Sequence, residues 1–77
     1  MSGMENQIPA QILLIDDHEA TRETLSEELE DSGHIVSQAE NFASALRILK
    51  EKEFDLILSD LVLPDGTGMD LIAQARA

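Results

Sequence analysis

Residues 12–18, ILLIDDH, run four apolar residues directly into two adjacent aspartates. The apolar run is short and branched, and with Gln11 it is typical of a strand buried on both faces of a parallel sheet. An isolated acidic pair before a helix is most often a cap that complements the helix dipole. A second strand that ends in the same way would instead favour a site at the end of both strands.

That second strand is predicted at residues 54–59, FDLILS, and Asp60 follows it directly. Between the two strands, residues 19–33 show helical spacing and end at Gly33, a typical left-handed helix stop. Residues 34–39 form a weaker strand, and residues 41–53 form a helix that Asn41 caps. A loop over residues 61–68 leads to a third helix from residue 69. Three successive strand–helix units predict an α/β domain with a parallel sheet.

Helical spacing also predicts which side chains share one face of a helix. In the first helix one helical stripe consists of Ala20, Thr21, Thr24, Leu25 and Leu29. In the third helix Leu71, Ile72 and Ala75 are predicted to face inward.

The acidic residues at the strand ends form the candidate site. The carboxyl ends of parallel strands lie at one edge of the sheet, and if the second strand lies outside the first, the first and third are neighbours. Asp16, Asp17 and Asp60 would then converge, and their like charges would repel one another. A divalent cation relieves that repulsion, and oxygen-only ligands in this arrangement favour Mg²⁺.

Composition excludes several classes of function. Five basic residues against sixteen acidic ones give a net charge of −11, which disfavours direct binding to nucleic acid or to an anionic membrane surface. The absence of cysteine excludes disulfides and thiolate metal sites. We find neither a signal peptide nor an apolar run long enough to span a membrane. We therefore expect a cytoplasmic protein.

The segments LIDDH and DLILSDLVLPDGTGMDL together resemble the receiver domain of two-component response regulators and hybrid sensor kinases. The spacing from Asp60 to Pro64, Gly68 and Leu71 fits the pattern of that family. The resemblance covers residues 11–77 and implies the first three strands and helices (βαβαβα) of a flavodoxin-like parallel sheet. Residues 1–10 are expected to be a flexible leader.

The resemblance also implies roles for individual residues. Asp60 would be the phosphoacceptor, receiving a phosphoryl group from a histidine kinase, a phosphotransfer protein or a small phosphodonor. Asp17, Asp60 and the backbone carbonyl of Val62 would contact Mg²⁺ directly, and Asp16 would act through a metal-bound water. The chain would then be a signalling module and not an enzyme in the usual sense.

Receivers of this family continue beyond the third strand, so the chain resembles a truncated receiver. The Ser/Thr and the Lys that contact the phosphoryl group in the family lie on those later strands. Lys50 and Lys52 are expected at the opposite edge of the sheet from Asp60 and would not replace that lysine. The third strand is left as an edge without a charge among residues 56–58, which predicts a homodimer or completion of the sheet by a partner.

Two other functions compete with the phosphoacceptor. One is a phosphorylation-incompetent half-receiver that acts as a dimerisation or interaction module through the exposed third strand. The other is a phosphohydrolase with an aspartate nucleophile, which would need a general acid two residues later. That position holds Val62 after Asp60 and His18 after Asp16, and neither residue fits the general acid that a phosphohydrolase would need. His18 itself is expected to be a helix residue beside the site, and Asp65 a turn residue in the PDG segment.

Overall fold

The computed structural model describes residues 9–60 and 62–75 of the chain. Its elements are β1 (Gln11–Ile15), α1 (Glu19–Asp31), β2 (Ile35–Ala39), α2 (Phe42–Glu51), β3 (Leu56–Ser59), β4 (Val62–Leu63), β5 (Gly66–Thr67) and α3 (Gly68–Ala75). The predicted order of three strand–helix units is confirmed. Most of the predicted flexible leader, residues 1–8, lies outside the described residues.

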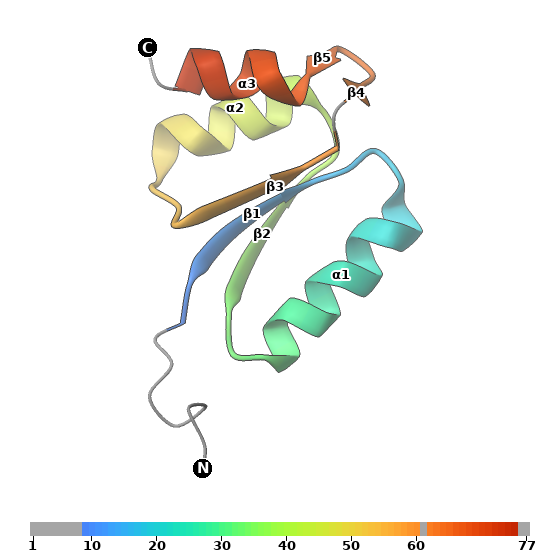
Figure 1. Ribbon diagram of the computed structural model, residues 1–77, viewed down its shortest axis with the longest axis vertical. Helices are drawn as coiled ribbons and strands as arrows, with labels where there is room; N and C mark the ends of the chain where they lie inside the picture. Colours follow the sequence, from blue (N-terminus) through green and yellow to red (C-terminus); the bar gives the residue numbers. More distant parts are fainter. Residues whose placement is uncertain (1–8, 61, 76–77) are drawn as a thin grey trace.

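The main sheet is parallel and has the strand order β2-β1-β3. Ile12 of β1 lies opposite Val36 of β2 and opposite Leu56 of β3. Helix α1 covers one side of the sheet, and α2 and α3 lie together on the other (Figure 1). The second strand therefore lies outside the first, so that β1 and β3 are neighbours.

The hydrophobic core lies where β1 meets α2 and α3. Residues 12–15 of β1 are at most 3% exposed, as expected for a central strand covered on both faces. Ala45 of α2 and Leu71 of α3 are fully buried in one cluster with Leu13 and Ile15. Asn41 caps α2 as predicted, because its side chain accepts a hydrogen bond of 2.8 Å from the Ser44 amide.

In the helical stripe predicted on α1, Leu29 is half-buried. The other members, Ala20, Thr21, Thr24 and Leu25, are exposed. The buried residue of α1 is Ser26, whose hydroxyl accepts a hydrogen bond of 3.1 Å from the Gln38 side chain on β2. Leu25, although 38% exposed, also faces the sheet, because it lines a hollow with Leu14 of β1 and Leu58 of β3.

Helix α3 departs from its predicted face. Leu71 is fully buried, but Ile72 is 40% exposed, and the side chain of Ala75 lies outside the described residues. No described helix has the combination of length and apolar character that a membrane span requires.

The predicted loop over residues 61–68 contains a small antiparallel hairpin formed by β4 and β5. Asp65, in the turn of this hairpin, accepts hydrogen bonds of 2.6 Å and 3.0 Å from the amides of Phe42 and Ala43. The Phe42 ring covers Gly66 so closely that an added Cβ would lie 2.5 Å from it. The hairpin is therefore fastened to the beginning of α2.

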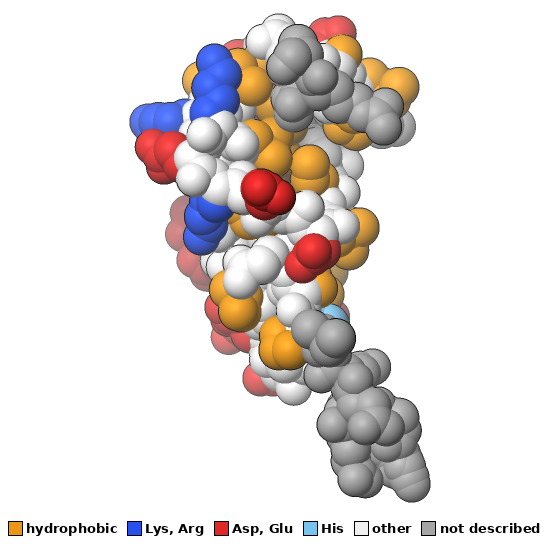
Figure 2. Space-filling view, turned by 90° about the vertical axis from the view of Figure 1, so that its left-hand side faces the viewer, with side chains coloured by type: hydrophobic (Ala, Val, Ile, Leu, Met, Phe, Trp, Pro, Cys, Tyr) orange, Lys and Arg blue, Asp and Glu red, His pale blue; other side chains and the backbone are white. Residues whose placement is uncertain are grey.

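Strand β3 is an edge of the sheet, as predicted. Leu56 is 45% exposed and Leu58 is 36% exposed. Figure 2 shows hydrophobic side chains reaching the surface on one face of the molecule, with Lys and Arg gathered along one margin of it.

Candidate functional site

The acidic residues occupy the carboxyl edge of the sheet, where the two strands that carry them lie side by side. The amide of Asp60 donates a hydrogen bond of 3.1 Å to the carbonyl of Ile15, and the amide of Asp16 donates one of 3.1 Å to Ala39. These bonds continue the two parallel ladders by one residue beyond the strands. Both aspartates are therefore positioned by the backbone of the sheet.

Four side chains meet at this edge. Asp16, Asp17, His18 and Asp60 each offer one ligand atom, and these four atoms lie within 4.8 Å of one another. The three carboxylates expected from the sequence are thus brought together. His18, which the sequence placed beside the site, belongs to the cluster itself.

His18 joins the carboxylates because it is both the N-cap residue of α1 and the end of a tight turn. Its amide donates a hydrogen bond of 2.8 Å to Asp16 Oδ1. Its ring nitrogen Nδ1 lies 3.0 Å from Asp16 Oδ1 and 3.1 Å from Asp17 Oδ1. A metal ion and a proton on His18 would therefore compete for the same carboxylate oxygens.

Electrostatic interactions shift the pKa values of two of these groups in opposite directions. The hydrogen bond from the His18 amide lowers the pKa of Asp16, and partial burial opposes this effect. The hydrogen bond with Asp16 raises the pKa of His18, and the negative charges of Asp17, Asp16 and Asp60 add to the increase. The site therefore favours the ionised form of Asp16 and the protonated, positively charged form of His18.

Arg22 supports the turn that carries the acidic pair, a role that the sequence analysis missed. Its Nη1 donates a hydrogen bond of 2.7 Å to the backbone carbonyl of Asp16, and its Nε donates one of 3.0 Å to Gln38 Oε1. The only available signal was a single basic residue in an otherwise acidic helix.

The loop after Asp60 approaches its backbone closely. A Cβ added to Gly68, the first residue of α3, would lie 2.9 Å from the carbonyl oxygen of Asp60. Only glycine therefore allows α3 to begin at this distance. Val62 begins β4, and its side chain is 70% exposed; the contact of its carbonyl with a metal stays a prediction.

The donor set fits Mg²⁺. Three carboxylates provide hard oxygen ligands, and Mg²⁺ in proteins typically takes one or two carboxylates and keeps several waters. The convergence of the carboxylates also supplies the charge that such a cation would neutralise.

Comparison with known proteins agrees with this geometry. The family described as the response regulator receiver domain matches residues 12–77. The alginate biosynthesis transcriptional regulatory protein AlgB of Pseudomonas putida is 40% identical over 75 residues, which are 97% of this chain and 16% of AlgB.

Two solved structures are similar in fold. The chemotaxis response regulator CheY4 of Vibrio cholerae has a TM-score of 0.85 at 32% identity, over 90% of this chain and 57% of CheY4. The response regulator protein TrrA of Thermotoga maritima, solved in complex with Mg²⁺ and BeF, has a TM-score of 0.80 at 33% identity. That match covers 86% of this chain and 57% of TrrA. The chain thus spans little more than half of these receivers.

Proposed function

Because the chain belongs to the family of response regulator receiver domains, we propose that it accepts a phosphoryl group on Asp60 within a Mg²⁺ site. The observation that carries this proposal is the convergence of Asp16, Asp17 and Asp60 at the ends of two adjacent parallel strands. The same convergence favours this function over a half-receiver that acts only as an interaction module.

In the proposed reaction, a carboxylate oxygen of Asp60 attacks the phosphorus of a phosphohistidine. The new O–P bond forms an acyl phosphate, the P–N bond breaks, and its electron pair remains on the imidazole nitrogen. The backbone bond from Asp60 to Ile15 holds the attacking carboxylate at the open edge of the sheet.

The other residues of the site prepare Asp60 for this attack. Asp17 and Asp60 are proposed to bind the metal directly together with the carbonyl of Val62, and Asp16 through a water. Mg²⁺, when bound, supplies positive charge that offsets the negative charge of the phosphoryl oxygens. Arg22 keeps the turn that bears Asp16 and Asp17 in place through its bond to the Asp16 carbonyl.

The phosphoryl donors are proposed to be a histidine kinase or a phosphotransfer protein, as in two-component signalling. On this proposal the chain is a substrate and signal carrier and not an enzyme in the usual sense. The cytoplasmic location stays a prediction.

Phosphorylation can be tested with acetyl phosphate and Mg²⁺, by mass spectrometry of the intact chain. We expect the wild type to gain the mass of one phosphoryl group and the Asp60→Asn variant to gain none. Asp31→Asn, which removes the same charge at the far end of α1, serves as the matched control and should be modified like the wild type. Equal modification of Asp60→Asn, or no modification of a folded wild type, would contradict the proposal.

A further inference from the structure

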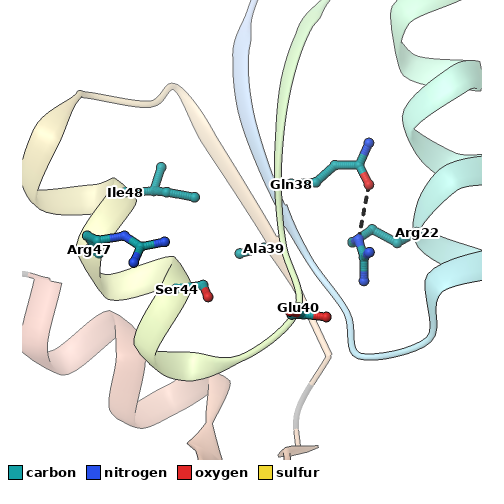
Figure 3. Close-up of a pocket in the computed structure, with 7 residues that line it drawn as sticks. All are labelled: Arg22, Gln38, Ala39, Glu40, Ser44, Arg47 and Ile48. Carbon is teal, nitrogen blue, oxygen red and sulfur yellow. Dashed lines mark hydrogen bonds between the residues drawn. The ribbon is translucent and has the colours of Figure 1, made fainter.

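The outer edge of β2 carries a polar hollow, of which the proposed phosphoacceptor site uses Arg22 alone. The hollow has a volume of about 250 Å³ and is lined by Arg22, Gln38, Ala39, Glu40, Ser44, Arg47 and Ile48 (Figure 3). Two of the five Lys and Arg residues of a chain with a net charge of −11 therefore line a single surface depression.

The two arginines lie on opposite sides of β2. Arg22 projects from α1 and bonds the Gln38 side chain, whereas Arg47 extends from α2 toward Ala39 (Figure 3). Ala39 belongs to the core on the α2 side of the sheet, and Gln38 bonds Ser26 of α1 on the other side. The hollow therefore spans the edge of the sheet, with one positive charge on each side of it.

Neither arginine is neutralised by a contact with a described carboxylate. Within the described residues Arg22 donates to a backbone carbonyl and to an amide oxygen, which are neutral acceptors, and its charge acts on the Asp16 carboxylate only as a minor contribution to the lowered pKa of that group. Arg47 forms no hydrogen bond or ion pair within residues 9–60 and 62–75. Glu40 lines the hollow without forming an ion pair with either arginine in that part of the chain.

The backbone between the arginines is prepared for another strand. Strand β2 has only β1 as a neighbour within the described sheet. Ile35 donates its amide to Ala10, and Ala39 accepts at its carbonyl from Asp16, so these two residues bond toward β1. Because bonding direction alternates along a strand, Val36 and Gln38 direct their amides and carbonyls outward.

We infer that the edge of β2 binds an extended segment of a partner protein that carries two adjacent acidic residues. Successive side chains of a strand point to opposite faces of a sheet. A strand added beside β2 would therefore direct one carboxylate toward Arg22 and the next toward Arg47. Main-chain hydrogen bonds to Val36 and Gln38 would supply affinity, and the two arginines would select the acidic pair.

The test titrates the full chain, without Mg²⁺, with a short peptide of alternating Thr and Val that carries Glu at two adjacent central positions. Amide chemical shifts in NMR spectra report binding. We expect saturable shifts concentrated at Val36, Gln38 and Glu40. A second peptide with the same composition places its two Glu residues two positions apart, so that both lie on one face, and it should bind about tenfold more weakly.

Variants of the chain test the roles of the charges on Arg47 and Glu40. Arg47→Gln should weaken binding about tenfold, because one charge-assisted contact is lost. Lys50→Gln removes the same charge from the same helix without lining the hollow and should bind like the wild type. Glu40→Gln should bind more tightly, since a negative charge is removed from beside the incoming carboxylates.

Three results would overturn the inference. They are the absence of saturable shifts in the wild type, equal binding of the two peptides, and equal loss of binding in Arg47→Gln and Lys50→Gln. Because Asp60 and Mg²⁺ take no part in this experiment, its failure would leave the proposed phosphorylation unaffected.

Discussion

At the scale of single residues, Asp65 shows how one carboxylate serves a turn and a distant helix together. The sequence predicted only the turn. Its two oxygens also accept the first amides of α2, from residues that are 23 and 22 positions away in the chain. Desolvation raises the pKa of Asp65. Hydrogen bonds from the amides of Phe42, Ala43 and Asp65 itself lower it by more, so that the pKa lies below its ordinary value of 3.8.

This pKa predicts how the contribution of Asp65 to stability depends on pH. A carboxyl whose pKa is lowered by folding stabilises the fold above its unfolded pKa, and this contribution is lost as the pH falls through the lower, folded pKa. We therefore expect Asp65→Asn to unfold at a lower urea concentration than the wild type at neutral pH. The difference between the two should shrink as the pH is lowered below 3.8.

Urea titrations at several pH values check this prediction. Glu27→Gln, on the exposed side of α1, provides a control for the loss of a carboxylate that accepts no helix amide. A difference between Asp65→Asn and the wild type that stays constant down to acidic pH would contradict the prediction.

The site residues separate into those that the sequence could predict and those that it could not. Asp16, Asp17 and Asp60 follow apolar strands, so strand order alone brings them to one edge. The contacts of His18 and Arg22 depend on the exact turn between β1 and α1, which spacing does not specify. Asp65 depends on a contact across the fold, and its sequence neighbours indicate only a turn.

At the scale of elements, α3 offers a direct test of which helix face is buried. Leu71 is fully buried and the adjacent Ile72 is 40% exposed. Leu71→Ala should lower the free energy of unfolding by about 2–5 kcal/mol, because it removes core volume. Ile72→Ala should change it by only about 0.5 kcal/mol, as is usual for surface positions.

Urea unfolding followed by circular dichroism measures both variants. Ile72→Ala is the matched control, since it removes a side chain of similar size from the same turn of the helix. Equal losses in the two variants would mean that α3 presents both residues to the core, as the sequence had predicted.

Strands were easier to predict than helix faces, and for a physical reason. An uninterrupted apolar run such as residues 12–15 can only be buried on both sides, so β1 was clear from the sequence. In α1 the apolar side chains are few, and more than one rotation of the helix satisfies them. The hydrogen bond between the buried Ser26 and the exposed Gln38 constrains the rotation, and it joins two elements that periodicity treats separately.

At the scale of the whole molecule, the exposed edge of β3 and the net charge have opposite effects on self-association. Leu56 and Leu58 favour pairing with another strand, whereas a charge of −11 makes two copies repel each other. The predicted homodimer through β3 should therefore be favoured by added salt, which screens the repulsion.

Light scattering across protein and salt concentrations tests this dimer. We expect the average mass to rise toward that of a dimer with both, and Leu58→Lys to remain a monomer under the same conditions. Glu53→Gln, which makes the same change of one charge unit toward positive just outside β3, controls for charge alone. A wild-type monomer at every concentration of protein and salt would contradict the prediction.

The central position of β1 has a consequence for the motions of the chain. An amide in β1 can exchange its hydrogen with solvent only if neighbouring strands separate, whereas the outer amides of β2 face the solvent already. The most slowly opening segment is therefore β1, which leads directly into Asp16 and whose last residue, Ile15, accepts the Asp60 amide at its carbonyl. Local fluctuations can loosen the surrounding helices and the hairpin while Asp16 and Asp60 both stay attached to β1.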